Sequence, residues 1–270
     1  MSRPDAPVGA DWLALREPAD AAARAVELAD QARAHLPAGR LVVRDLGCGT
    51  GSMGRWLAGR LPGPQHWVLH DRDPALLDRA VTGLPAHVTA EPCPGDLTEL
   101  DAARLAGTDL VTASALLDLL TVDEVERLAA ACTAAACPAL LTLSVTGSVL
   151  LTPADPLDAA FAAAFDAHQR RTVGGRRLLG PDAPPAAAAA FRRLGARVVR
   201  APSPWRLGAG DGALVEEWLR GWVEAACAHS PSLATETDAY LRRRLDAAAR
   251  GELRVVVGHA DLLALPGRGA

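Results

Sequence analysis

A buried strand that runs directly into a glycine cluster is the feature that most restricts the fold of this chain. Residues 41–46 read Leu-Val-Val-Arg-Asp-Leu, and three glycines follow at alternate positions, Gly47, Gly49 and Gly51. Glycine lets the backbone turn sharply and approach a ligand closely. The helix expected from Ser52 onward adds free backbone N–H groups and a positive dipole end at the same place. This strand–loop–helix unit predicts a ligand site at the end of the strand.

The rest of the chain continues the alternation of strands and helices. Further strands are expected at residues 67–70, near Val88, and at residues 109–111, 139–145, 196–199 and 253–257. Asp73-Pro74 and the capping box from Thr121 to Glu124 are typical helix starts. This alternation predicts an α/β fold with a mostly parallel sheet and helices on both faces. We expect one Ala-rich helix within residues 18–36 and a polar connection at residues 146–156.

The chain shows no internal repeat and no segment that reads as a disordered linker. We therefore predict a single domain over residues 1–270, with the cofactor-binding core at residues 37–145. Residues 146–180 and 202–252 are long for ordinary connections and leave the sheet at its ligand-binding edge. They are expected to form helical elaborations over the active face, on the substrate side.

The charged residues narrow the choice of partners and chemistry. All 28 cationic residues are arginines, and the formal net charge is −4. An acidic balance disfavours a nucleic-acid partner. Residues 49–54 satisfy the dinucleotide pattern G-x-G-x-x-G, but a short-chain dehydrogenase also needs a Tyr/Lys pair, and the chain has no lysine.

Cysteine usage and hydropathy predict a cytoplasmic protein without membrane association. The five cysteines are scattered without a CxxC pair, as in reduced cytosolic proteins. The first residues contain no apolar signal-peptide region, and no apolar run approaches the roughly 20 residues that cross a bilayer. No His/Cys/carboxylate cluster has the spacing of a metal site.

Two kinds of ligand fit the glycine loop. In a dinucleotide site, Asp71 would bind a ribose hydroxyl. In the alternative, D-x-G-x-G-x-G, Asp45 lies where a cationic amino group needs a carboxylate, which suits an amino-acid-bearing nucleoside and repels a pyrophosphate. Downstream, Asp96 in Gly95-Asp96-Leu97 could bind the exocyclic amine of adenine or simply cap a helix.

Four segments occur in a recognisable order: DLGCGTG at 45–51, HDRDP at 70–74, GDL at 95–97 and DLVTASALLDLL at 109–120. As a set they resemble the class I S-adenosylmethionine-dependent methyltransferases, over about Leu41 to Ser144. The resemblance implies a Rossmann-like sheet of seven strands, the last antiparallel, with S-adenosylmethionine across the ends of the first four. It implies a cofactor site in which the three glycines flank the methionine part, Asp71 holds the ribose, Arg72, Asp96 and Leu97 contact the adenine, and Ser114 lies near the sulfonium.

Methyl transfer needs a positioned acceptor and often the removal of its proton. His168 and Asp118 are the candidate bases, and the alternative for His168 is an exposed helical histidine. The candidate substrate-binding residues are Trp205, Arg206 and Trp222, although tryptophans spaced in this way commonly belong to a hydrophobic core. Arg16 and Glu17 could fold over the methionine end of the cofactor.

His259 and Asp261 follow the last expected strand. If that strand is antiparallel, its carboxyl end lies at the opposite edge of the sheet from the cofactor. We therefore expect both residues to be structural.

We predict methyl transfer to an oxygen or nitrogen of a small molecule, with specialised metabolism as a candidate setting. One alternative is an S-adenosylmethionine-binding scaffold or regulator without catalysis. Another is an RNA or protein methyltransferase, which needs a basic face built from Arg170, Arg171, Arg176, Arg177, Arg192 and Arg193. The sequence leaves the oligomeric state open.

Overall fold

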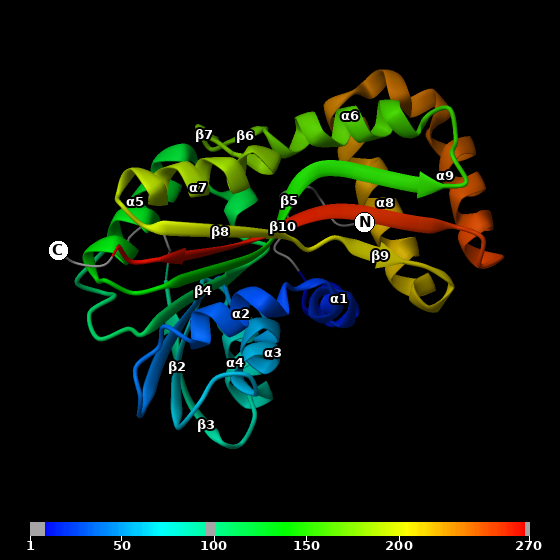
Figure 1. Ribbon diagram of the computed structural model, residues 1–270. Helices are drawn as coiled ribbons and strands as arrows, with labels where there is room; N and C mark the ends of the chain where they lie inside the picture. The colour runs from blue at the N-terminus through cyan, green and yellow to red at the C-terminus, as the bar shows by residue number, and fades with distance from the viewer. Residues whose placement is uncertain (1–8, 96–100, 268–270) are drawn as a thin grey trace.

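A single twisted sheet runs through the molecule, and helices lie on both of its faces (Figure 1). The computed structural model describes residues 9–95 and 101–267. The sheet order is β3-β2-β1-β4-β5-β10-β8, with β9 also paired to β10. The strands are β1 (Leu41–Leu46), β2 (Gln65–Asp71), β3 (Val88–Pro94), β4 (Leu110–Ser114), β5 (Ala139–Thr152), β8 (Arg197–Pro202), β9 (Trp205–Leu207) and β10 (Arg254–Leu265).

The predicted sheet is confirmed in direction and differs by one strand in number. The strands from β3 to β5 pair in parallel, and β10 is antiparallel to both β5 and β8. The three residues of β9 make eight strands in the sheet rather than seven. A separate two-stranded hairpin joins β6 (Thr172–Val173) to β7 (Arg176–Arg177).

Three hydrophobic clusters hold the layers together. On one face, α2 (Val26–Arg33), α3 (Ser52–Ala58) and α4 (Pro74–Gly83) pack against the sheet. On the other, the sheet is covered by α5 (Val122–Ala134) and α7 (Ala183–Arg193). The third cluster joins α1 (Ala10–Ala23), α6 (Asp158–Gln169), α8 (Gly212–His229) and α9 (Ala234–Ala249) to β9 and the first part of β10.

The helix starts expected from the sequence are present. The Asp73 side chain accepts a hydrogen bond from the Ala75 N–H, with Pro74 in the first turn of α4. Thr121 and Glu124 form the complete capping box of α5. These caps satisfy backbone N–H groups that a helix N-terminus otherwise leaves unpaired.

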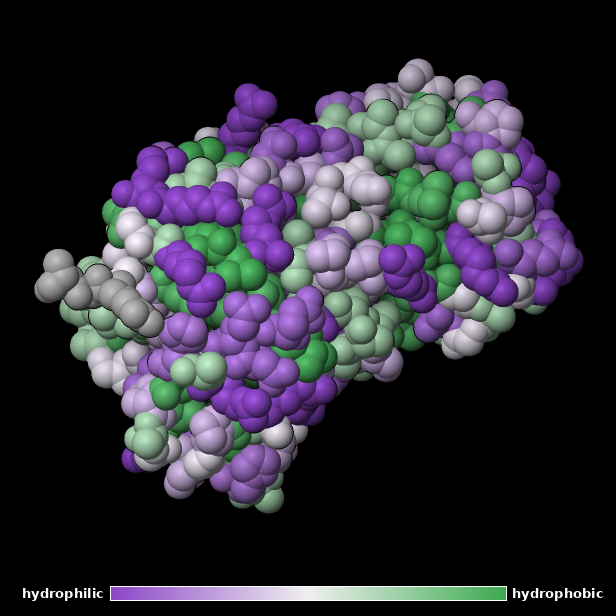
Figure 2. Space-filling model, in the orientation of Figure 1, coloured by the Kyte–Doolittle hydropathy of each residue, from purple (hydrophilic) through white to green (hydrophobic). Residues whose placement is uncertain are grey.

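Two strands are longer than expected, and the polar connection predicted at residues 146–156 is wrong. β5 continues to Thr152, and β10 pairs with it from Arg254 opposite Thr152 to Ala264 opposite Ala139. Exposure alternates along the added part of β5, so its polar residues occupy the open face of a half-covered strand. Leu150 on that face is 62% exposed, and Figure 2 shows hydrophobic side chains gathered over this part of β5 and β10.

The helix expected within residues 18–36 is two helices. α1 ends at Ala23, α2 begins at Val26, and Arg24 and Ala25 between them have extended ψ angles of 135° and 97°. The Ala25 N–H donates to the carboxylate of Asp261 on β10 rather than to a helical carbonyl. A partner 236 residues away therefore breaks the helix, which local sequence does not reveal. Among the described residues, no helix is long and apolar enough to cross a membrane.

Candidate active site

The glycine loop leaves β1 at the carboxyl edge of the parallel strands. Gly47, Gly49 and Gly51 have φ angles of 64°, 54° and 85°, in the left-handed region that favours glycine. A Cβ atom on Gly51 would lie 3.0 Å from the backbone Cα of Ala80. Helix α3 begins directly after the loop, as the sequence predicted.

The acid at the end of β2 is hydrogen-bonded to this loop. One carboxylate oxygen of Asp71 accepts from the Gly49 N–H at 2.9 Å, and the other accepts from the Asp73 N–H at 3.0 Å. Each oxygen has two lone pairs, so the carboxylate can still accept from ribose hydroxyls. The neighbouring Arg72 is exposed. Asp96 and Leu97 lie outside the described residues.

Asp45 lies fully buried beneath the loop. Its Oδ1 accepts a hydrogen bond from the Thr112 hydroxyl at 2.8 Å, whereas its Oδ2 has no partner among the described residues. Burial raises the pKa of this carboxyl to about 7, against the lowering effects of Thr112 and Arg24. A cationic partner would therefore stabilise the ionised form of the Asp45 carboxyl group.

Arg24 supplies the opposite charge, and the sequence analysis missed it. Its guanidinium is buried between Ser52 and Ser114, and Nη2 donates to both hydroxyls at 2.9 and 3.1 Å. Its Nε and Nη1 have no hydrogen-bond partner within the described part of the chain. The one signal in the sequence was an arginine inside an Ala-rich segment that was expected to pack.

Arg24 and Asp45 together fit the methionine part of the cofactor. Buried polar groups in proteins nearly always have partners, and leaving one unpaired is costly. A ligand with an α-carboxylate and an α-ammonium would supply an acceptor for Arg24 and a donor for Asp45. The donor set at the glycine loop thus suits an amino-acid-bearing nucleoside.

Helix α1 covers the loop. A Cβ atom on Gly49 would lie 3.0 Å from Cδ1 of Leu13, so α1 packs directly against the glycine. Glu17 pairs with Arg55 on α3, and Arg55 also donates to the Thr50 carbonyl. Arg16 instead pairs with Asp20 one turn further along α1. The structure thus places the predicted N-terminal cover over the loop, with its two charged residues bound to protein partners.

Trp205 connects α1 to β9 and β10. Its indole N–H donates to Asp20 at 2.9 Å, and the Arg16 guanidinium lies 4.9 Å from its ring centroid. The ring centroid of His259 lies 5.3 Å away on another side. Arg206 is exposed. Trp222 is 1% exposed and stacks on Trp218 within the third hydrophobic cluster, to which Trp205 also belongs.

The two candidate bases have different surroundings. Asp118 is half-buried in the short 3₁₀ turn at Leu117–Leu119, four residues past Ser114. Burial raises the pKa of Asp118 to about 6, while the charges of Arg16 and Arg171 act in the opposite direction. His168 is buried on the same face of α6 as Phe161 and Ala164, so its exposed alternative is wrong.

His259 and Asp261 are not at the far edge of the sheet, and our expectation of their position is wrong. Because β10 extends to Leu265, both residues lie in its middle. His259 pairs with Val145 and Ala260 with Ser144, while Thr142 of the same strand pairs with Ser114. Both residues therefore lie near the cofactor edge. Burial lowers the pKa of His259 to about 3, which keeps its imidazole neutral.

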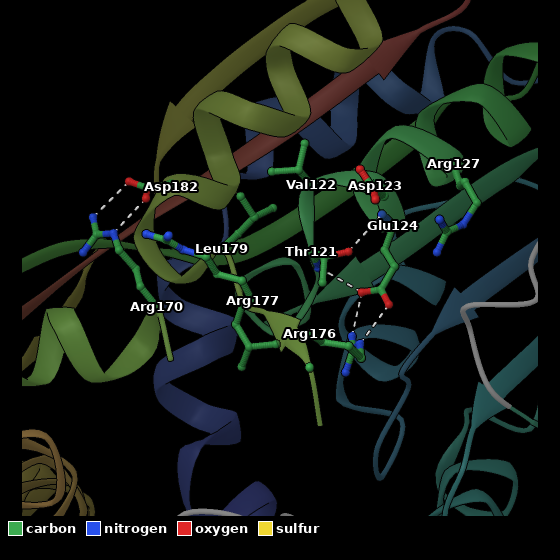
Figure 3. A pocket seen from close by; sticks show the side chains of 12 residues that line it. Thr121, Val122, Asp123, Glu124, Arg127, Arg170, Arg176, Arg177, Leu179 and Asp182 are labelled. Carbon is green, nitrogen blue, oxygen red and sulfur yellow. Dashed lines mark hydrogen bonds and ion pairs between the residues drawn. The ribbon is translucent and has the colours of Figure 1, made fainter. Parts of the chain in front are cut away.

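A cleft of about 550 Å³ lies between the start of α5 and the β6–β7 hairpin (Figure 3). Arg170 donates to Asp166 and Asp182, and Arg176 donates to Glu124 and to the Leu119 carbonyl. On the neighbouring helices, Arg193 pairs with Glu126. At least three of the six arginines of the expected basic face are thus paired with carboxylates.

Comparisons with known proteins match part of the sequence to a family model and the fold to solved structures. Residues 43–138 match a family model described as a methyltransferase domain. A putative methyltransferase from Bacillus halodurans C-125 is 12% identical, with a TM-score of 0.51, and the match covers 90% of this chain and 100% of that one. The cyclopropane synthase MmaA2 from Mycobacterium tuberculosis is 14% identical over 88% of this chain and 83% of that one, with a TM-score of 0.48. A search of curated proteins finds no match.

The family match covers the segment that contains the glycine loop, Asp71 and Ser114, and the Bacillus structure shares the fold. The cofactor that this loop serves is S-adenosylmethionine. Residues 43–138 therefore form a methyltransferase domain, and the Bacillus structure shows the same fold over most of the chain.

Proposed function

We propose that the protein transfers the methyl group of S-adenosylmethionine to an oxygen or nitrogen atom of a small molecule. Asp118 carries this proposal, because it is a half-buried carboxyl with a raised pKa four residues beyond Ser114. A carboxyl whose pKa lies near the working pH can accept a proton from a hydroxyl or ammonium group. Specialised metabolism and a cytoplasmic location belong to the same proposal.

Each end of the cofactor has a proposed partner. Arg24 would bind its α-carboxylate and Asp45 its α-ammonium, since both side chains have unpaired buried atoms. Asp71 would accept from the ribose hydroxyls, while Gly47, Gly49 and Gly51 let the loop approach the ligand. Arg72, Asp96 and Leu97 stay proposed at the adenine and Ser114 near the sulfonium. When bound, S-adenosylmethionine supplies an electrophilic methyl group.

The acceptor would lie between Asp118 and Trp205. Asp118 would hold the acceptor atom and take its proton. His168, near the C-terminal end of α6, is the second candidate base. Trp205, Arg206 and Trp222 stay proposed as acceptor-side residues, with Trp205 supported best because it contacts α1 beside the glycine loop.

A small acceptor is favoured over RNA or protein by the charges on the elaborations. Arg170, Arg176 and Arg193 each pair with an acid, which removes much of the basic face that a polyanion would need. The helices of residues 146–180 and 202–252 instead pack around aromatic side chains. That arrangement supports an enclosed acceptor.

Isothermal titration calorimetry with S-adenosylhomocysteine tests the cofactor site. The wild-type protein should bind it, whereas Gly49→Arg and Asp71→Ala should lose most of the affinity. Asp78→Ala, on the exposed face of α4, is the matched control and should bind normally. Failure of the wild-type protein to bind would overturn the proposal.

A panel of small hydroxyl and amine acceptors, monitored by S-adenosylhomocysteine release, then tests transfer. Turnover that is lost in Asp118→Asn while cofactor affinity is retained supports the proposed base. Cofactor binding without turnover on any acceptor would favour the scaffold alternative, and turnover only on RNA or protein would favour the macromolecular one.

A further inference from the structure

Asp261 joins three segments of the chain that are far apart in sequence. Its Oδ2 accepts the Ala25 N–H at 2.8 Å, at the joint between α1 and α2. Its Oδ1 accepts the Leu143 N–H at 2.8 Å and a short hydrogen bond from the Ser203 hydroxyl. The side chain is fully buried. Such a carboxylate fixes the relative positions of β5, the β8–β9 connection and the helix joint.

The backbone of Leu143 is held in an unusual conformation where it donates to Asp261. Its φ angle is 56°, which is unusual for a residue other than glycine and costs about 1 kcal/mol or more. The register between β10 and β5 shifts at the same level, between Ala260 and Leu262. A bulge of this kind turns a backbone N–H away from the strand ladder. Here that N–H points to Asp261.

The hydrogen bond from the Ala25 N–H connects Asp261 to the cofactor site. Ala25 follows Arg24 directly, and Arg24 has an extended ψ of 135° at the joint. The Arg24 side chain turns to Ser52, at the start of α3, and to Ser114, at the end of β4. Because Ala25 has no side-chain cap of its own, the Asp261 carboxylate is the acceptor that ties the backbone of this joint to the sheet.

We propose that Asp261 is a positioning residue for the amino-acid part of the cofactor, acting through the α1–α2 joint that carries Arg24. The inference rests on the proposed function, in which Arg24 binds the α-carboxylate. Both carboxylate oxygens of Asp261 accept hydrogen bonds from protein groups. Its loss should therefore weaken recognition of the amino-acid part and leave recognition of the adenosine part intact.

Two ligands separate these effects in calorimetry: S-adenosylhomocysteine, and 5′-methylthioadenosine, which has the same nucleoside and thioether but no amino acid. Asp261→Asn should reduce the affinity for S-adenosylhomocysteine by about tenfold, the equivalent of one lost hydrogen bond to a charged group. Its affinity for 5′-methylthioadenosine should stay within about twofold of the wild type. Arg24→Gln should show the same selectivity.

The Arg24→Gln/Asp261→Asn double variant tests whether the two residues act together. If Asp261 acts through Arg24, the double variant should lose no more affinity for S-adenosylhomocysteine than Arg24→Gln alone. Ser203→Ala is the matched control, since it removes a donor to the same carboxylate without touching the joint. It should lower thermal stability but leave the ratio of the two affinities unchanged.

Ala25→Pro provides a second route if Asp261→Asn does not fold. The φ of Ala25 is −72° and the ψ of Arg24 is 135°, both compatible with proline at position 25. This change removes only the N–H from which Asp261 accepts a hydrogen bond. Like Asp261→Asn, it should lower the affinity for S-adenosylhomocysteine relative to that for 5′-methylthioadenosine.

Equal losses for both ligands, or additive losses in the double variant, would overturn the positioning role. A wild-type protein that binds neither ligand would overturn the proposed function as well. Binding of both ligands with no selective effect of Arg24→Gln would overturn the inference alone.

Discussion

Glu17 on α1 and Arg55 on α3 form a two-point ion pair across the glycine loop. Nε of Arg55 lies 2.7 Å from Oε1 of Glu17, and Nη2 lies 2.5 Å from Oε2. The third donor of the same guanidinium, Nη1, reaches the Thr50 carbonyl inside the loop. One arginine thus joins the covering helix to the backbone of the glycine loop.

Glu17→Gln should loosen this cover. Both side chains are 27% exposed, so the pair contributes about 1 kcal/mol or less, and the affinity for S-adenosylhomocysteine should fall by up to about fivefold. Calorimetry measures the change. Asp11→Asn, at an exposed position in the first turn of α1, should leave the affinity unaltered. Equal effects of both variants would contradict a role for the ion pair.

Cofactor binding should release a proton at neutral pH. Burial raises the pKa of Asp45 to about 7, and a bound ammonium group lowers it again. Affinity for S-adenosylhomocysteine should therefore rise with pH up to about 7 and change little through this group above it. Calorimetry at pH 6 in two buffers of different ionisation enthalpy counts the protons. Asp45→Asn should abolish the release by this group, and undiminished release from that variant would contradict the assignment.

The same shift affects the stability of the protein without ligand. The native carboxyl holds a proton up to pH about 7, whereas the unfolded one loses it near its usual 3.8. Between these values the folded state binds more protons, so the contribution of Asp45 to the free energy of unfolding falls as pH rises. Urea unfolding of the wild type and of Asp45→Asn, compared at pH 5 and pH 7.5, isolates that contribution. A pH dependence that is identical in both proteins would count against it.

Asp118 should titrate near pH 6 in the free protein. Carboxyl ¹³C chemical shifts, assigned with Asp118→Asn, measure this pKa without an acceptor. Because the charge of Arg16 lowers the pKa of Asp118, Arg16→Gln should raise it further. Arg206→Gln, at an exposed site, serves as the control. An ordinary carboxyl pKa near 4 would remove the basis for Asp118 as the base.

The indole N–H groups of Trp205 and Trp222 should differ in their contribution to stability. The N–H of Trp205 donates to Asp20, whereas that of Trp222 has no hydrogen-bond partner among the described residues. Both rings are buried, so replacement by Phe removes a similar volume from each site. Trp205→Phe should cost about 1 kcal/mol more than Trp222→Phe in urea unfolding. Equal losses would show that the Asp20 hydrogen bond adds little.

Local patterns were sufficient for the cofactor half of the fold. The apolar run at residues 41–46, the alternating glycines and the caps at Asp73 and Thr121 are all short-range signals, and each lies in the element that it predicted. Parallel strands in a covered sheet follow directly from their alternation with helices.

Long-range contacts explain what the sequence analysis missed. The break at Arg24 depends on Asp261, so residues 18–36 alone read as one helix. The extension of β5 depends on β10, which was expected to be five residues long and has twelve. Because the last strand was expected to end at Val257, His259 and Asp261 were expected at the wrong edge of the sheet. Arg24 could be recognised as a site residue only after the fold had placed it beside Ser52 and Ser114.

The continuous strands β5 and β10 also determine how the molecule can move. They pair from Ala139 to Thr152, with two shifts of register, and extend from the cofactor half into the helical layer formed by α6, α8 and α9. A hinge between those halves would have to break this two-stranded ladder. Local displacement of α1, which covers the glycine loop, would open the site without breaking that ladder.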